Sequence, residues 1–261
     1  MYIDTHCHLT FPQFDSDRAM VIGNAKKVGV KQFIIPGSSI GSSSKAVSFA
    51  RSQKNGIFAA LGCHPYEVSD KPNIQTLEKL LGPKVIAIGE CGLDYYLFKG
   101  FTAEGKKTEQ KIFFEEHLRL ALKHALPLII HCRDAYDEIF DVLDSLPTMP
   151  KGVFHCFAGG VHDIKEVEKR GFYFGIDGNV TYSKQLALTV PLIPLDKLLL
   201  ETDAPYLPPI PYRGERCEPK YIPLIAKKIA ELKQCTIKQV QDVTTKNAHT
   251  LFGIHIAEEK L

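Results

Sequence analysis

The chain has 261 residues, of which 44% are hydrophobic, so it is long enough to bury a large core. This length is compatible with one α/β barrel domain or with two smaller domains. The formal net charge of +2 lacks the basic excess of a protein that holds long stretches of nucleic acid, so any nucleic-acid substrate would be gripped through only a few phosphates.

The chain has seven cysteines, an odd number, and is large enough to fold without disulfide bonds. We therefore do not expect a complete set of disulfides, which favours a reducing compartment. The N-terminal residues resemble a strand rather than the basic and apolar regions of a signal peptide. No apolar run approaches the ~18 residues of a membrane span. We therefore expect a soluble, cytoplasmic protein with no membrane association, and the sequence indicates no obligate protein partner.

Eight short apolar runs recur along the chain, and most of the intervals between them have the spacing of an amphipathic helix. The first run leads directly into His6 and His8. The other seven predicted strands lie at residues 32–36, 57–61, 85–88, 128–130, 152–154, 172–176 and 197–200.

Helix start and stop signals follow the first two strands. Asp15 or Ser16 is placed to cap a first helix, and Gly29 is placed to end it. The second helix is expected to start between residues 42 and 44. The chain thus begins with strands and helices in strict alternation.

The middle of the chain interrupts this alternation once. Residues 94–106 are predicted to form a longer loop, followed by a strongly amphipathic helix that ends before Pro127. Asp134 is placed to cap the next helix, and residues 183–190 are expected to hold one short helix.

The last part of the chain combines a rigid loop with two helices. The segment 205–223 is rich in proline and is predicted to be an active-site loop that carries Arg213. Helices are expected at residues 219–232 and 236–252.

This alternation is typical of a (β/α)8 TIM barrel rather than of an open doubly wound sheet. Catalytic groups of such barrels sit at the C-terminal ends of the strands, and here histidines and acids follow the apolar runs immediately. An open sheet would gather its chemistry at one switch point. Since the sequence has no internal repeat or linker, we predict one domain over residues 1–261 with a metal site at the C-terminal ends of the strands.

Six residues at these strand ends are candidate metal ligands. Residues i and i+2 of an extended segment point to the same side, so the first two histidines can bind one ion together. Four imidazoles and two carboxylates suit divalent Zn, Mn, Co or Ni, with Mg as a further candidate, and are enough for two ions that share a bridging ligand. A structural role is the usual explanation for one histidine but does not account for six such residues. The candidates are His6, His8, Glu90, His131, His155 and Asp203.

Five cysteines neighbour these groups and raise the alternative of a thiolate zinc site. Each is adjacent in sequence to a candidate ligand or, for Cys63, to His64, so in extended backbone its side chain faces the opposite way. We interpret them as small buried thiols packed behind the site. They are Cys7, Cys63, Cys91, Cys132 and Cys156.

Two further residues have both a substrate and a structural interpretation. His64 follows the third strand, where it either contacts a substrate phosphate or is a turn residue, and we favour substrate contact. Arg133, two residues beyond His131, either pairs with a phosphate or forms a salt bridge to a barrel carboxylate.

Other polar residues are expected to play supporting roles. Asp94 and Glu201 are placed to hold the ligands from behind. Asp177 follows the seventh strand and is interpreted as a solvated or structural acid. His117 and His124 lie on the long amphipathic helix, where we assign them surface roles.

Taken together, these motifs resemble the TatD family of metal-dependent hydrolases, within the amidohydrolase-like superfamily. The resemblance implies a distorted TIM barrel and a divalent-metal hydrolase that uses the six residues above as ligands. Characterised members are nucleases, often acting on DNA from the 3′ end, and some relatives are reported to deacylate D-aminoacyl-tRNA. The matching segments are 4–8, 62–65, 89–94, 131–133, 154–159, 201–205, 247–248 and 251–252.

The sequence departs from the family pattern at three positions. Cys91 stands where an apolar residue is usual, Ala158 where serine is common, and Cys217 where the proline-rich loop would carry asparagine. These changes spare the six ligands and alter the substrate loop.

We therefore predict a metal-dependent phosphodiesterase, specifically a deoxyribonuclease of the 3′-5′ exonuclease type whose substrate is DNA or another nucleic-acid phosphodiester. Two divalent ions would activate water and clamp the phosphodiester. Asp203 and Glu90 are the predicted catalytic residues, as general base and bridging ligand. His64, Arg133 and Arg213 are the predicted substrate contacts.

Two alternatives remain open at this point. The first keeps the enzyme but changes the bond to an ester or amide, such as that of D-aminoacyl-tRNA, because the same activated water can attack a carbonyl. The second is a non-catalytic binding or scaffold barrel, against which the complete ligand set argues.

Overall fold

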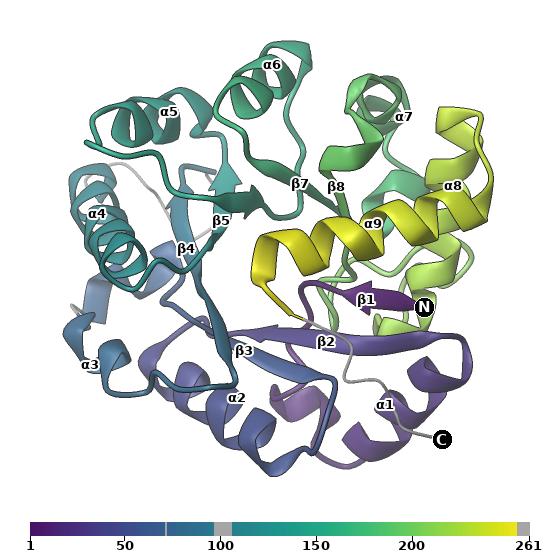
Figure 1. Cartoon of the computed structure of the whole chain (residues 1–261), viewed down its shortest axis with the longest axis horizontal. Helices are drawn as coiled ribbons and strands as arrows, with labels where there is room; N and C mark the ends of the chain where they lie inside the picture. The colour runs from purple at the N-terminus through teal and green to yellow at the C-terminus, as the bar shows by residue number, and fades with distance from the viewer. Residues whose placement is uncertain (71, 97–105, 255–261) are drawn as a thin grey trace.

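The computed structural model describes residues 1–70, 72–96 and 106–254. Within these residues eight parallel strands pair in sequence order, with helices around them (Figure 1). The strands are β1 (Tyr2–Asp4), β2 (Val30–Pro36), β3 (Ile57–Leu61), β4 (Val85–Asp94), β5 (Leu128–Arg133), β6 (Gly152–Phe154), β7 (Tyr173–Ile176) and β8 (Leu198–Leu200).

The barrel closes at the seam between β8 and β1. The Thr5 amide donates a hydrogen bond to the Leu200 carbonyl (3.0 Å), and Cys7 and Ala204 form an isolated parallel bridge just beyond. Both strands are only three residues long, so the loops that follow them complete the closure. The predicted (β/α)8 barrel is confirmed.

The helices pack their apolar stripes against the barrel wall. In α4, for example, Phe114, Leu118 and Ala121 are buried at helical spacing. The helices are α1 (Arg18–Lys27), α2 (Ile40–Ser52), α3 (Gln75–Glu78), α4 (Lys107–Lys123), α5 (Tyr136–Asp144), α6 (Val161–Lys169), α7 (Lys184–Thr189), α8 (Ile222–Lys233) and α9 (Ile237–Phe252).

Several predicted helix starts were wrong by a few residues. Helix α1 follows Asp17, whose side chain pairs with Arg216 instead of capping the helix. Helix α2 begins earlier than predicted, because Ser39 caps it in a reciprocal capping box. Asp134 does not cap α5, because it adopts a positive φ of 53° as the chain leaves β5. The predicted stop at Gly29, with φ 93°, is confirmed.

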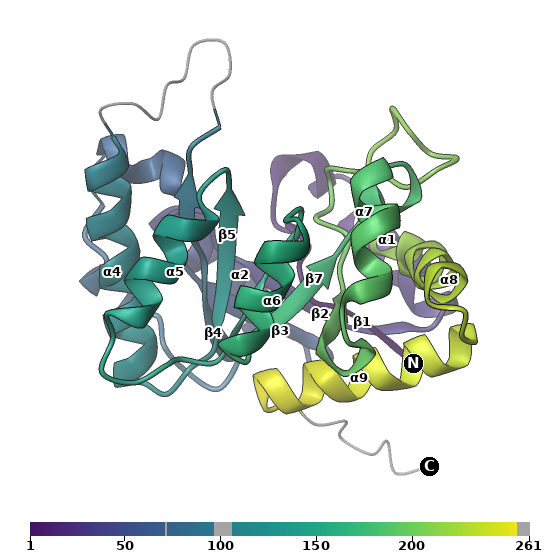
Figure 2. The same cartoon turned by 90° about the horizontal axis from the view of Figure 1, so that it is seen from above.

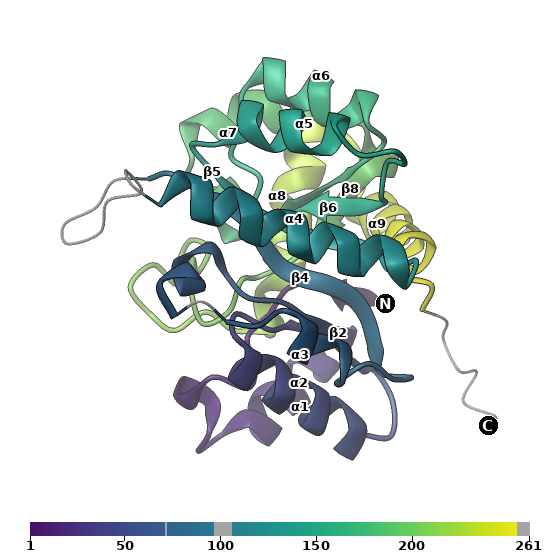
Figure 3. The same cartoon turned by 90° about the vertical axis from the view of Figure 1, so that its left-hand side faces the viewer.

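Helix α9 covers the barrel end from which the strands start, while the arrowheads of β5 and β7 point to the opposite end (Figure 2). Its residues Leu251 and Phe252 belong to the same buried cluster as Ile3 and Ile34 of the first two strands. Figure 3 shows the loop between β8 and α8 at the end opposite α9. The C-terminal ends of the strands are therefore left open for a functional site.

Two expectations from the sequence concern membrane association and the long loop. Within the described ranges, no helix is both long enough and apolar enough to cross a membrane. The loop predicted at residues 94–106 falls largely outside the described residues.

Candidate metal centre

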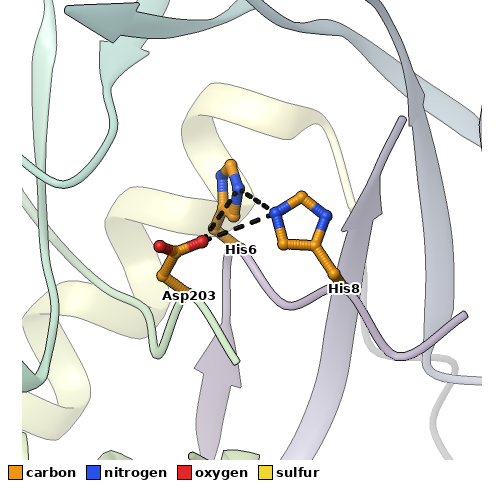
Figure 4. A group of neighbouring side chains, drawn as sticks. All are labelled: His6, His8 and Asp203. Carbon is orange, nitrogen blue, oxygen red and sulfur yellow. Dashed lines mark hydrogen bonds and ion pairs between the residues drawn. The ribbon is translucent and has the colours of Figure 1, made fainter. Parts of the chain in front are cut away.

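The closing seam of the barrel brings three candidate ligands together. The Asp203 amide donates a hydrogen bond to the His6 carbonyl (2.9 Å), and the His8 amide donates to the Ala204 carbonyl (2.7 Å). The side chains of His6, His8 and Asp203 point toward one another from the two sides of the seam (Figure 4). Backbone bonds between distant segments therefore fix their relative positions.

The donor atoms of these residues are spaced like the corners of one coordination shell. His6 Nε2 lies 3.2 Å from His8 Nε2, and Asp203 Oδ1 lies 3.6 Å and 3.4 Å from these two nitrogens. Glu90 Oε2 forms a fourth corner, 3.4 Å from His6 Nε2 and 3.6 Å from His8 Nε2. Bonds of about 2.0–2.2 Å to one tetrahedral ion separate neighbouring donors by roughly 3.3–3.6 Å. We call these four atoms the first donor group, and their spacing fits a divalent ion.

Glu90 reaches the barrel interior because β4 is irregular at this point. The register of β4 against β5 shifts between Gly89 and Cys91, so Glu90 stands at a bulge. Gly89 and Gly92 have φ values of 149° and 148°, which residues with side chains rarely adopt. A Cβ atom on Gly92 would lie only 1.9 Å from the His131 carbonyl oxygen. The glycines therefore allow β4 to approach β5 closely on either side of Glu90.

The other oxygen of Glu90 takes part in a second donor group. Glu90 Oε1 lies 3.0 Å from His131 Nδ1 and 3.0 Å from His155 Nε2, and these two nitrogens are 3.3 Å apart. The carboxylate of Glu90 thus lies between the two groups and offers one oxygen to each. This arrangement fits a pair of ions with one bridging carboxylate.

Two buried acids lie behind the histidines of the second donor group. Asp94 Oδ2 is 2.9 Å from His131 Nε2, and Glu201 Oε1 is 3.5 Å from His155 Nδ1. Glu201 also accepts a hydrogen bond from the Cys156 amide. A carboxylate behind a ligating histidine fixes which ring nitrogen carries the proton and how the ring is oriented.

The pKa shifts of Glu90, Asp203 and His6 favour the charge states that bind cations. Burial alone would raise the pKa of Glu90, but its contacts with His155, His131 and His6 hold that pKa well below its usual range. The pKa of Asp203 is likewise low, because the hydrogen bond from His8 and the charge of His6 outweigh burial. Burial and the nearby charge of His155 lower the pKa of His6, which favours its neutral form. Ionised carboxylates and neutral imidazoles are the forms that bind metal ions.

In the second donor group, burial alone would lower the pKa of both imidazoles. Asp94 and Glu90 nevertheless raise the pKa of His131, and Glu90 and Glu201 raise the pKa of His155. An ion bound there would therefore take the place of protons on these rings.

The donor groups open into a cavity of about 710 Å³. Its wall combines the donor residues with aromatic, cationic and small polar side chains. Besides His8, Glu90, His131, His155 and Asp203, it is lined by Phe11, Ser38, His64, Tyr66, Glu67, Asp94, Cys132, Arg133, Cys156, Ala158, Asn179, Tyr206 and Leu207.

The three predicted substrate contacts differ in position. His64 lines the cavity with its Nε2 atom 3.6 Å from Glu90 Oε1, and burial lowers its pKa to about 3. Arg133 also lines the cavity, with its guanidinium stacked 3.5 Å from the ring centroid of Tyr96. Arg213 is exposed on the loop after β8, lies over the ring of Tyr182 at 3.8 Å, and is absent from the cavity wall.

Comparison with known proteins decides the family. The sequence model of the family described as "TatD related DNase" matches residues 3–253. The chain belongs to the TatD family. The predicted family and the predicted enzyme class, a metal-dependent hydrolase acting on ester bonds, are therefore confirmed.

The relatives of this TatD-family hydrolase span almost its whole length. "Uncharacterized metal-dependent hydrolase YabD" of Bacillus subtilis is 37% identical and covers 98% of this chain and 100% of its own. "3'-5' ssDNA/RNA exonuclease TatD" of Cronobacter sakazakii is 38% identical and covers 95% and 97%. The solved structure of YJJV, a TatD homologue from Escherichia coli, superimposes with a TM-score of 0.88 at 29% identity and covers 97% and 98%.

The cysteines of this TatD-family chain only partly follow the expected pattern. Cys7, Cys63 and Cys91 are fully buried, as expected. Cys132 and Cys156, however, contribute to the cavity wall. The alternation of extended backbone does not apply to Cys156, because that residue has a positive φ of 46°.

The surface role predicted for His117 was wrong. His117 is fully buried, its Nε2 atom accepts a hydrogen bond from the Cys63 amide (3.1 Å), and its Nδ1 atom donates to the Phe113 carbonyl (2.8 Å). The ring therefore fixes the backbone next to His64. The signal was present in the sequence, because His117 lies on the same helical stripe as Phe113, Phe114 and Ala121.

Of the two interpretations of Asp177, the structural one holds. Its side chain is buried and accepts a hydrogen bond from the Asn179 amide (2.7 Å), and burial raises its pKa to about 7.

Sequence reasoning did not identify the aromatic part of the cavity wall. Phe11, Tyr66 and Tyr206 all line it. Tyr66 forms hydrogen bonds with both Asp94 and Arg133 and so connects the arginine to the acid behind His131. One signal in the sequence was spacing, since two of these aromatic residues follow a candidate ligand by three positions.

Proposed function

We propose that this TatD-family hydrolase is a metal-dependent 3′-5′ exonuclease that acts on single-stranded DNA or RNA. The observation that carries the proposal is the carboxylate of Glu90, which offers one oxygen to each of two donor groups at the base of an open cavity. The name of the Cronobacter relative supports the substrate class.

The first ion would be held by His6, His8 and Asp203, and the second by His131 and His155, with Glu90 shared between them. Two divalent ions bound in this way supply the Lewis acidity that activates water and offsets negative charge on a phosphodiester. Nitrogen and oxygen donors of this kind suit Zn, Mn, Co or Ni, and Mg²⁺ is included in the test below.

Asp203 is the proposed general base. Its side chain lines the cavity and is ionised at neutral pH, because its pKa lies below the usual range. It can therefore accept the proton of the attacking water while its Oδ1 atom remains in the first donor group.

Arg133 and His64 are proposed to position the scissile phosphate. Stacking on Tyr96 and a hydrogen bond to Tyr66 hold the Arg133 guanidinium at the cavity wall, where it can pair with a phosphate oxygen. His64 is neutral at physiological pH and offers hydrogen bonding without charge. One arginine at the wall agrees with a chain of low net charge that grips few phosphates.

The test uses a 5′-labelled single-stranded oligonucleotide with added Mg²⁺ or Mn²⁺. We expect a ladder that shortens from the 3′ end, its loss on addition of EDTA, and its restoration by excess metal. Asp203→Asn should abolish hydrolysis, whereas the control Asp242→Asn, on α9 at the far end of the barrel, should retain it.

An aminoacyl ester assayed beside the oligonucleotide distinguishes the nuclease from the alternative of an ester or amide hydrolase. Cleavage of the ester alone would refute the nuclease proposal. Normal oligonucleotide turnover by Asp203→Asn would refute the role of Asp203 as general base.

A further inference from the structure

Two aromatic side chains stand beside the first donor group, and each is held by the same kind of turn. The Phe11 amide donates a hydrogen bond to the His8 carbonyl (2.9 Å), and the Tyr206 amide donates to the Asp203 carbonyl (2.9 Å). Each ring therefore follows a candidate ligand by three residues, and its backbone is tied to that ligand. We call Phe11 and Tyr206 the aromatic corner.

The two rings form an L-shaped surface. Phe11 stacks on the imidazole of His8, with ring centroids 4.4 Å apart and an interplanar angle of 20°. Tyr206 stands at 76° to Phe11, at a centroid distance of 6.5 Å, and lies 6.4 Å from the His8 ring. Both residues line the cavity.

Packing alone explains Phe11 but not Tyr206. Phe11 covers one face of His8 and so helps to orient that ring. Tyr206 is 48% exposed, although it lies at the cavity wall where its backbone is fixed. An aromatic ring whose backbone is fixed and which is left half exposed beside the donor groups is suited to contact with a ligand of flat, aromatic character.

We propose that the aromatic corner binds the nucleobase of the 3′-terminal nucleotide, and this inference rests on the proposed nuclease function. A base lying there is one sugar away from a phosphodiester placed at the donor groups beside His8. Stacking of bases on aromatic rings tolerates any sequence, because every base has a π face.

The first arm of the test measures hydrolysis of two oligonucleotides that differ only in their 3′-terminal residue, which is deoxyadenosine in one and abasic in the other. The measured quantity is kcat/KM for the deoxyadenosine oligonucleotide divided by kcat/KM for the abasic one. Tyr206→Ala should lower this ratio by about 10-fold, mainly through KM, because it removes one stacking surface. Tyr206→Phe keeps the ring and should preserve the ratio. Equal loss on both oligonucleotides, or no loss, would overturn the proposal.

The second arm measures binding without turnover. Calorimetry with Mn²⁺ present compares deoxyadenosine 5′-monophosphate with 2-deoxyribose 5-phosphate, which lacks the base. The wild-type protein and Tyr206→Phe should bind the nucleotide about 10-fold more tightly, and Tyr206→Ala should lose most of this difference.

The two arms separate failure of the base site from failure of the nuclease. Hydrolysis from the 3′ end with a ratio that does not depend on Tyr206 refutes the base site and leaves the nuclease standing. A protein that cleaves neither oligonucleotide but prefers the nucleotide through Tyr206 has the base site without the nuclease activity. Equal binding of the two small ligands by the wild-type protein refutes the base site in either case.

Discussion

The Asp203 amide donates a hydrogen bond of 2.9 Å to the His6 carbonyl across the seam between β8 and β1. The same bond therefore helps to close the barrel and to position the residues of the first donor group. The side chains of the same two residues approach to 3.6 Å between His6 Nε2 and Asp203 Oδ1. Any change that opens the seam should therefore also separate the donors.

Replacement of Glu90 should affect both donor groups at once. Each oxygen of its carboxylate faces one group, so Glu90→Gln removes a charged donor from both sites. We expect the content of bound metal to fall well below that of the wild type, whereas His131→Asn should affect only the second group and lose about half as much. Elemental analysis after gel filtration measures this. Glu168→Gln, an exposed acid on α6, serves as the control. Equal metal content in Glu90→Gln and the control would contradict the bridging role.

Loss of the acid behind His131 should weaken metal binding while all direct ligands remain. Asp94 Oδ2 lies 2.9 Å from His131 Nε2 and orients that ring. Asp94→Asn should lower the affinity for divalent metal by about 10–100-fold, the usual effect of removing such a partner. Titration of the metal-free protein by calorimetry provides the measurement, with Asp137→Asn on α5 as the control. An unchanged dissociation constant would show that Asp94 does not support the ligand.

The buried ring of His117 should make stability depend on pH. Burial lowers its pKa from 6.5 to about 4 in the folded protein, so the unfolded chain binds more protons between these values. The stability that the neutral ring contributes is fully present above pH 6.5 and is lost as the pH falls toward 4. His117→Gln should remove this loss, which amounts to about 3 kcal/mol. Urea unfolding of the wild-type protein and His117→Gln at pH 7 and pH 4.5 measures how much the free energy of unfolding of each falls between these pH values. An equal fall in both proteins would refute the low pKa assigned to His117.

Gly92 should not tolerate a side chain. Its φ of 148° disfavours any other residue, and a Cβ atom there would lie 1.9 Å from the His131 carbonyl oxygen. Gly92→Ala should push β4 away from β5 and lower the free energy of unfolding by about 2–4 kcal/mol. Gly171→Ala is the matched control, because Gly171 also has a positive φ, but a Cβ atom there would meet none of the described residues within 4 Å. It should cost only about 1 kcal/mol. Similar losses in both variants would mean that the close approach of the strands is unimportant.

Some elements could be predicted to the residue, and others could not. β3 and β6 have the predicted bounds, because each is a short apolar run that begins at or after a glycine and ends where polar or turn-favouring residues follow. β4 extends well beyond its apolar run to Asp94, because the bulge at Glu90 and the glycines on either side keep it paired with β5. Such pairing depends on a neighbouring strand and leaves no local signal.

The candidate site shows the same division. The residue types of the donors could be read from the ends of the apolar runs. The burial of His117 could also have been read from its place on the apolar stripe of α4, whereas the exposed position of Arg213 could not, because it depends on how the loop after β8 packs.

By itself, the sequence determined the alternation of strands and helices and the kind of donor at the end of each strand, because periodicity and turn residues act over short distances. Only the tertiary structure decided which donors form a group. His6 and Asp203 come from opposite ends of the barrel sequence, and closure of the seam brings them together. It also decided that the two oxygens of Glu90 face different groups, because that orientation follows from the bulge and the register of β4 against β5.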